Sequence, residues 1–142
     1  MSIQFYNTLS KKKEEFRSIE DKSIKMYVCG PTVYDYFHIG NARSFIMSDV
    51  IRRYLEYRNY DVKFIMNITD VDDKIIKKAN KNGSSPESVA AEFTKAFLED
   101  IDKLGIKRAT VNPKATENIP EIIGIIKSLI SKGNAYQLGN DV

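Results

Sequence analysis

The distribution of apolar residues along the chain predicts strands that alternate with amphipathic helices. A mostly apolar run over residues 24–29 precedes Gly30-Pro31 and predicts a buried strand that ends in a turn. From Ile39 to Tyr57, apolar residues recur at the spacing of one helical face. A second apolar run, over residues 60–68, predicts another buried strand.

The second half of the chain predicts three further helices. Residues 70–79 are expected to form a short helix with acidic residues at its favourable N-terminal end. Ser85-Pro86 predicts an N-cap and a first helical position, which open a helix that runs to residue 104. Asn118-Ile119-Pro120-Glu121 resembles a capping box and predicts a helix to about residue 131. Residues 135–137 resemble the beginning of a strand.

This alternation predicts an α/β fold, in which a parallel sheet has helices packed on its faces. Ligands of such sheets bind at the carboxyl ends of the strands. Cys29 and the loop containing His38 follow the first predicted strand, and Thr69-Asp70 follows the second, so these residues should face one crevice. Two strands make an incomplete sheet, and residues 140–142 resemble a turn that enters another strand. We therefore expect the chain to be an N-terminal piece of a longer protein.

Composition narrows the class of protein without identifying a function. The 142 residues are 42% hydrophobic and 29% charged, as in ordinary globular proteins. The sequence contains no apolar run of membrane-spanning length and does not begin like a signal peptide. A single cysteine excludes an internal disulfide framework and favours a reducing, cytoplasmic location. The net charge of +3 permits contact with nucleic acid but does not argue for it.

The loop around His38 has the outline of a nucleotide site. His38 lies between a predicted strand and a predicted helix, where unpaired backbone N–H groups and the helix dipole attract phosphate. Gly40 has no side chain to keep a ligand away from the first helical turn. A packed histidine or a helix cap would explain the same residue equally well.

Other polar residues also have a structural interpretation beside a functional one. Cys29, taken alone, is more typical of a small buried apolar residue than of a metal ligand. The aspartates at 70, 72 and 73 resemble a metal-binding cluster, but we favour helix N-capping because no EF-hand spacing follows. Arg52-Arg53 and Lys77-Lys78 are interpreted as solvated faces of helices.

Four blocks of sequence, in order, resemble the N-terminal catalytic region of the cysteinyl-tRNA synthetases. They lie at residues 7–16, 26–43, 67–75 and 132–136, so the resemblance covers essentially the whole chain. It implies the Rossmann-like parallel sheet of a class I synthetase nucleotide-binding domain, incomplete in this chain. It also implies that residues 1–110 form the first part of that domain and that residues 111–142 begin a connective region.

The resemblance implies an activity and its substrates. The family joins cysteine to the α-phosphate of ATP, releases pyrophosphate, and passes the cysteinyl group to tRNA(Cys). L-cysteine, ATP with Mg²⁺, and tRNA(Cys) are therefore the implied partners, with no role for a membrane. Two alternatives stay open. One is a cysteine-activating ligase of the mycothiol-pathway type, which uses an amino sugar as acceptor, and the other is a non-catalytic nucleotide-binding module.

The resemblance also assigns the site residues. His38 and Asn41 match the two ends of the HIGH signature, which in the family holds ATP phosphates and stabilises the transition state. Asn41 stands where that signature ends in histidine, and its amide can donate a hydrogen bond but carries no charge. The implied ATP-binding residues around this signature are Pro31, Thr32, His38, Ile39, Gly40 and Asn41. The implied pocket for the substrate cysteine contains Gly30, Thr32 and Thr69.

Cys29 matches the first zinc ligand of the family, in which the metal binds the thiolate of the substrate. Zinc prefers a soft thiolate to a hydroxyl, so metal ligation separates cysteine from serine. A catalytic zinc requires about three protein ligands beside an open position. Cys29 is the only cysteine and His38 is the only histidine, so we expect the remaining ligands beyond Val142. The second ATP signature of the family, K-M-S-K-S, is also missing, and we expect this chain alone not to aminoacylate tRNA.

Overall fold

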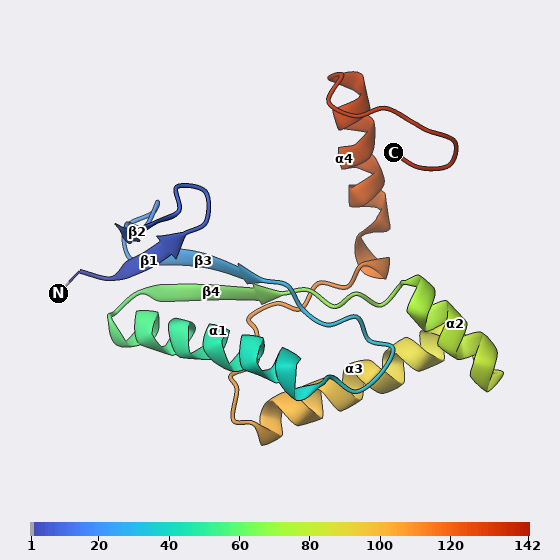
Figure 1. The fold of residues 1–142 in the computed structure, drawn as a ribbon, viewed down its shortest axis with the longest axis horizontal. Helices are drawn as coiled ribbons and strands as arrows, with labels where there is room; N and C mark the ends of the chain where they lie inside the picture. The colour runs from blue at the N-terminus through green and yellow to red at the C-terminus, as the bar shows by residue number, and fades with distance from the viewer. Residues whose placement is uncertain (1) are drawn as a thin grey trace.

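The structure is a computed structural model in which residues 2–142 are described. Figure 1 shows a small sheet with helices beside it and one helix that projects from this body. The elements in chain order are β1 (Gln4–Asn7), β2 (Lys12–Glu15), β3 (Ser23–Val28), α1 (Ile39–Tyr57), β4 (Asp61–Met66), α2 (Asp73–Asn82), α3 (Pro86–Lys103), the 3-10 turn η1 (Thr116–Asn118) and α4 (Ile119–Ser131).

The parallel sheet is built on β3 and β4, which pair from Ser23 opposite Asp61 to Val28 opposite Met66. The other edge of β4 makes two isolated parallel bridges to the segment after α3, through Val111 and Lys114. The predicted α/β fold with an incomplete parallel sheet is therefore confirmed. The sequence did not predict the antiparallel hairpin of β1 and β2, because these short strands are almost entirely exposed and lack an apolar alternation.

Helices α1 and α3 cover the same face of the sheet. Every second residue of β4 is buried, and Phe64 and Met66 pack with Phe45 of α1 and Phe97 of α3. Successive strands are added on the same side of the sheet, and right-handed crossovers then place both helices on one face. The predicted packing of helices on the sheet is therefore confirmed, and the described residues place α1 and α3 on the same face.

The predicted helices are present, with shifted ends. Helix α3 begins as predicted, since the Ser85 hydroxyl accepts a hydrogen bond from the Ser88 N–H at 3.2 Å and Pro86 follows the cap. Helix α2 begins three residues later than predicted, at Asp73, with Asp72 as its N-cap. The delay has a physical cause, because Thr69 still forms a parallel β-bridge with Thr32.

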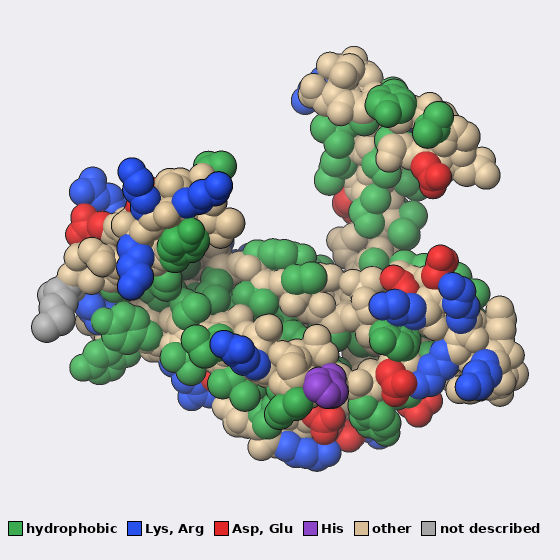
Figure 2. All heavy atoms as spheres, in the orientation of Figure 1, with side chains coloured by type: hydrophobic (Ala, Val, Ile, Leu, Met, Phe, Trp, Pro, Cys, Tyr) green, Lys and Arg blue, Asp and Glu red, His purple; other side chains and the backbone are tan. Residues whose placement is uncertain are grey.

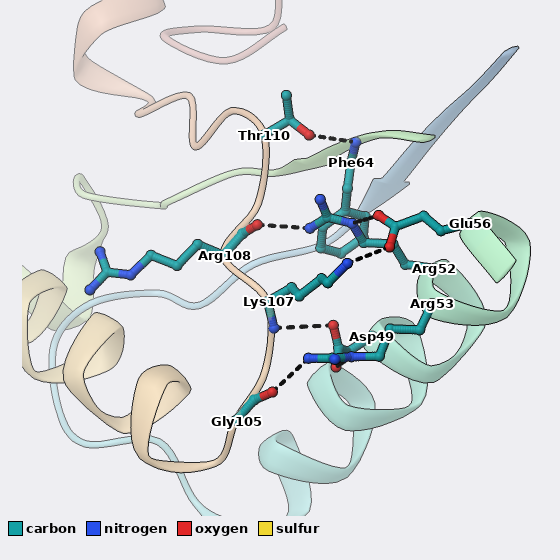
Figure 3. A network of polar contacts seen from close by, with 9 residues as sticks. All are labelled: Asp49, Arg52, Arg53, Glu56, Phe64, Gly105, Lys107, Arg108 and Thr110. Atoms are coloured by element: carbon teal, nitrogen blue, oxygen red, sulfur yellow. Dashed lines mark hydrogen bonds and ion pairs between the residues drawn. The ribbon is translucent and has the colours of Figure 1, made fainter. Parts of the chain in front are cut away.

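A polar network joins α1 to the segment that follows α3 (Figure 3). Asp49 is buried, and its carboxylate accepts hydrogen bonds from the Lys107 backbone N–H at 3.1 Å and from Arg53 Nε at 2.6 Å. Arg53 also donates to the Gly105 carbonyl at 2.7 Å. These bonds fix the chain reversal after α3 against the outer side of α1.

The same network continues one turn further along α1. Arg52 donates to the Arg108 carbonyl at 2.7 Å and to Glu56 at 2.9 Å, and its guanidinium lies over the Phe64 ring. The Lys107 ammonium donates to Glu56 at 2.6 Å and, together with Arg52, lowers the pKa of that carboxyl. The interpretation of Arg52-Arg53 as a solvated face is therefore wrong, because both side chains bind main-chain carbonyls of a distant segment.

Helix α4 exposes apolar side chains along its length, as Figure 2 shows. Ile125 is 62% exposed, and none of the helix residues is buried within the described part of the chain. The predicted capping box is wrong, because the Asn118 side chain makes no cap and donates instead to the Lys114 carbonyl at 2.7 Å. The strand expected at 135–137 is also absent from the described residues.

The predicted division at residues 110 and 111 stays a prediction. The segment beyond it remains bound to β4, since the Met66 N–H donates to the Val111 carbonyl at 3.1 Å and the Ile68 N–H to the Pro113 carbonyl at 2.8 Å. None of the helices in residues 2–142 is both long enough and apolar enough to cross a bilayer.

Candidate functional site

The predicted crevice lies where the pairing of β3 and β4 becomes irregular. The strands pair at Val28 and Met66, and pairing resumes at Thr32 and Thr69. Residues 29–31 on one side therefore face residues 67–68 on the other, which leaves one extra residue beyond β3. This is the arrangement of a β-bulge, a feature that re-aims side chains next to functional sites. Cys29 lies in this bulge and is exposed.

Gly30 packs tightly onto the opposite strand. A Cβ atom at this position would lie 1.7 Å from the Asn67 carbonyl oxygen, so the bulge excludes every residue except glycine. The Gly30 N–H, displaced from the strand ladder, donates to the Asn67 side-chain oxygen at 2.9 Å. The fold itself therefore demands a glycine beside Cys29.

His38 is the N-cap of α1. Its Nδ1 accepts a hydrogen bond from the Gly40 N–H at 3.1 Å, and the His38 N–H donates to Asn41 Oδ1 at 3.2 Å. The helix-cap interpretation of His38 is thereby confirmed. Because Nδ1 is the acceptor, the neutral ring carries its proton on Nε2, which can donate to a ligand.

The cap changes which groups could bind phosphate at this helix end. The N–H groups of Gly40, Asn41 and Ala42 already have acceptors on His38. Fewer backbone N–H groups are therefore unpaired at this helix end than the sequence suggested. A side-chain donor is available there, because Asn41 binds through Oδ1 and its amide Nδ2 has no partner among the described residues.

Gly40 differs from Gly30 in that the fold does not require it. A Cβ atom at position 40 would meet its nearest neighbour, His38 Nδ1, at 3.4 Å, which is an ordinary contact. Packing within the described chain therefore does not require a glycine at this exposed first turn. A ligand that lies against the turn would supply such a requirement.

A pocket of about 390 Å³ joins the bulge to the first turns of α1. Of the predicted site residues, it is lined by Cys29, Gly30, Pro31, Thr32 and Asn41. His38, Ile39 and Gly40 lie at the exposed start of α1, outside this lining, and Thr69 is half-buried opposite Thr32.

The pocket also contains residues that the sequence analysis did not single out. Its aromatic wall includes Phe37, Phe45, Phe93 and Phe97, which were recognisable only as core residues. Lys74, at the start of α2, lines the pocket with its ammonium 5.2 Å from the centre of the Tyr34 ring. No acidic partner of Lys74 occurs within the described residues, so this lysine offers a positive charge to the pocket.

The one carboxylate in the pocket lining is already paired. Asp35 accepts from the Lys78 ammonium at 3.1 Å, and that hydrogen bond lowers the pKa of Asp35. Lys78 lies 4.1 Å from the centre of the Phe93 ring. The reading of Lys78 as part of a solvated face is therefore wrong, and the pocket keeps a net positive character through Lys74.

The described residues supply one candidate metal ligand at this site. The predicted helix N-cap is confirmed for Asp72, which caps α2, whereas Asp70 accepts from the Thr116 backbone N–H of a distant segment at 3.0 Å. Residues 2–142 contain no group of three or more side chains suited to hold a metal ion. Cys29 alone does not fit a zinc ion, since such an ion needs about three protein ligands.

The fold and the site together match a class of enzyme domain. The family described as tRNA synthetases class I (C) catalytic domain matches residues 15–142, and the chain belongs to this family. Among curated proteins, a cysteine--tRNA ligase of Clostridioides difficile (strain 630) is 58% identical to the chain over 140 residues. The match covers 99% of the chain but 30% of that relative, so the chain spans about a third of its length.

Proposed function

We propose that the polypeptide carrying this chain is a cysteine--tRNA ligase. It activates L-cysteine with ATP and transfers the cysteinyl group to tRNA(Cys). One observation carries the proposal, namely that an exposed Cys29 and Asn41 of the first turn of α1 line one pocket in a chain 58% identical to a relative of that name. The relative's name supports a tRNA acceptor over the amino sugar of the mycothiol-type alternative.

The first step is adenylate formation. A carboxylate oxygen of cysteine attacks the α-phosphorus of ATP, the bond to the bridging oxygen breaks, and pyrophosphate leaves. Negative charge shifts toward the phosphate oxygens during this step. His38 Nε2–H, the Asn41 amide and the positive end of the α1 dipole stabilise that charge. Ile39 and Gly40 present the helix turn on which ATP lies, and Pro31 and Thr32 form its border with the pocket.

The substrate cysteine occupies the pocket beside the bulge. Gly30, Thr32 and Thr69 surround its amino-acid portion, and the thiol points toward Cys29. Were a zinc ion bound here, Cys29 would be its one ligand among residues 2–142, and the ion would favour the soft thiolate of the substrate over a hydroxyl. Because the described residues do not complete such a site, no step is assigned to the metal. Mg²⁺ enters with ATP, and a cytoplasmic location agrees with the single free cysteine.

Exchange of labelled pyrophosphate into ATP tests the proposal in the natural polypeptide that carries this chain. We expect exchange that depends on cysteine and is not supported by serine, followed by charging of tRNA(Cys). Cys29→Ser should lose bound zinc and cysteine activation while ATP binding persists. A wild-type protein without cysteine-dependent exchange, or a Cys29→Ser variant with unchanged zinc content, would contradict the corresponding part of the proposal.

The role of His38 requires a variant that keeps the helix cap. Asparagine is a good N-cap residue, so His38→Asn preserves the cap but removes Nε2–H. His38→Ala loses both and should also destabilise the helix, by about 1 kcal/mol. We expect both variants to lower the rate of adenylate formation at least tenfold with little change in cysteine affinity. A His38→Asn variant of wild-type rate would show that His38 serves only as a cap.

A further inference from the structure

We infer that Asn67 is a positioning residue for the amino-acid half of the site. This inference rests on the proposed function. Asn67 lies directly after β4, opposite the bulge that contains Cys29. Its side chain joins the two strand ends that the bulge separates, and in this way holds Cys29 and Thr69 in a fixed relation to one another.

Three hydrogen bonds carry the inference. Asn67 Oδ1 accepts from the Gly30 N–H at 2.9 Å and from the Tyr27 hydroxyl at 2.9 Å. Asn67 Nδ2 donates to Thr69 Oγ1 at 3.2 Å. The bulge removes the regular ladder partner of Gly30, so the amide side chain replaces a main-chain bond. The amide supplies an acceptor and a donor from one planar group without adding charge.

The bond to Gly30 fixes the peptide that adjoins Cys29. The Gly30 N–H belongs to the Cys29–Gly30 peptide, so a rotation of that peptide would shift the Cys29 backbone and redirect the thiol. The Cys29 sulfur itself lies 3.8 Å from the Gly30 carbonyl oxygen, which belongs to the next peptide. The clash that a Cβ atom would make at position 30 shows how closely this peptide lies on the Asn67 backbone. Asn67 thus holds the peptide from both its main chain and its side chain.

The bond to Thr69 fixes the direction of a hydroxyl. Because Asn67 Nδ2 donates to Oγ1, the hydroxyl proton of Thr69 points away from Asn67 and is not used in the bond between them. An aspartate at position 67 would accept that proton instead. Asn67→Asp therefore keeps the acceptor for Gly30 and Tyr27 but reverses the sense of the Thr69 bond.

The test compares substrate KM values in cysteine-dependent pyrophosphate exchange by the natural polypeptide. We expect Asn67→Ala to raise the KM for cysteine at least tenfold and the KM for ATP less than twofold. Asn67→Asp should give an intermediate increase. Tyr27→Phe, which removes one bond to Asn67 but leaves the links to Gly30 and Thr69, is the matched control and should resemble wild type. Equal changes in both KM values, or an unchanged KM for cysteine, would overturn the inference.

Hydrogen exchange separates this inference from the proposed function. In Asn67→Ala, the amides of Gly30, Thr32 and Val33 should exchange at least tenfold faster, while those of α1 and α3 keep wild-type rates. Unchanged exchange at these three amides would show that Asn67 does not hold the bulge, whatever reaction the protein catalyses. If the wild-type protein lacks cysteine-dependent exchange, the proposed function is wrong, and hydrogen exchange alone decides the role of Asn67.

Discussion

Alanine at position 30 should be far more harmful than alanine at position 40. In Gly30→Ala, the new Cβ atom would have to move from 1.7 Å to at least 3.0 Å from the Asn67 carbonyl oxygen. That separation would break the 2.9 Å bond from the Gly30 N–H to Asn67 and the two neighbouring bonds of Thr69, one to the Pro31 carbonyl and one from the Val33 N–H. Losing three hydrogen bonds of about 1 kcal/mol each gives a local destabilisation of about 3 kcal/mol.

Gly40→Ala is the matched control, since it adds the same methyl group at the other end of the loop. Its nearest neighbour would lie at 3.4 Å, and alanine is favoured over glycine in a helix by about 0.5–1 kcal/mol. The variant should therefore be as stable as wild type or slightly more stable. Its ATP affinity should nevertheless fall, because the methyl group occupies the surface against which we place ATP.

Hydrogen exchange followed by mass spectrometry can measure both effects in the natural polypeptide. A loss of 3 kcal/mol corresponds to roughly hundredfold faster exchange in the β3 and β4 peptides of Gly30→Ala. Gly40→Ala should keep wild-type exchange rates in the same peptides. Wild-type exchange in Gly30→Ala would refute the tight contact with Asn67, and unchanged ATP affinity in Gly40→Ala would refute the placement of ATP.

Three other predictions concern the charged residues around the sheet and pocket. Asp49→Ala leaves the Lys107 N–H without its acceptor and should lower the free energy of unfolding by about 2–3 kcal/mol in urea, whereas Asp49→Asn, which keeps an acceptor, should lose less. Because the folded-state pKa of Glu56 is lowered, its stabilisation is present above its ordinary pKa of 4.5 and is lost as the pH falls through the lower, folded-state pKa. Glu56→Gln should therefore reduce the loss of stability on acidification, and an identical acid profile would contradict that role. Lys74→Met should raise the KM for cysteine, which we place in this pocket, about tenfold, as expected for one lost charge-assisted hydrogen bond, while Lys77→Met, on the same helix but outside the pocket, should not.

The regular part of the fold could be predicted from the sequence because it depends on local periodicity. The strand before Cys29 and the helix from Ile39 to Tyr57 each bury one face. The residues on a buried face are mostly apolar, so their regular spacing in the sequence predicts the element. The hairpin of β1 and β2 was not predicted, because its strands are exposed and therefore have no regular apolar spacing. Cap residues at Ser85 and His38 were recognisable because a cap is made within a few residues of chain.

Contacts between distant segments could not be predicted in this way. Arg53 binds the backbone carbonyl of Gly105. Every residue type has such a carbonyl, so the sequence does not indicate which residue is the partner. Asn67 was visible only as part of a resembling block, because its role depends on the register of two strands and on the extra residue between them. Lys74 was passed over because its place in the pocket follows from where α2 begins, and that start was predicted three residues too early.

The bulge explains why the Cys29 thiol is exposed at the pocket and why its position depends on a neighbouring side chain. An uninterrupted parallel pair would give Cys29 a regular place in the ladder, its side chain standing on one face of the sheet like those of its neighbours. The extra residue places the thiol at the pocket instead, but it also deprives the Gly30 N–H of its ladder partner. A buried or half-buried N–H without an acceptor costs about 1–3 kcal/mol, so the exposed thiol is stable only where a neighbouring side chain supplies that acceptor. Asn67 does so, and the position of Cys29 therefore depends on a residue that need not touch the substrate.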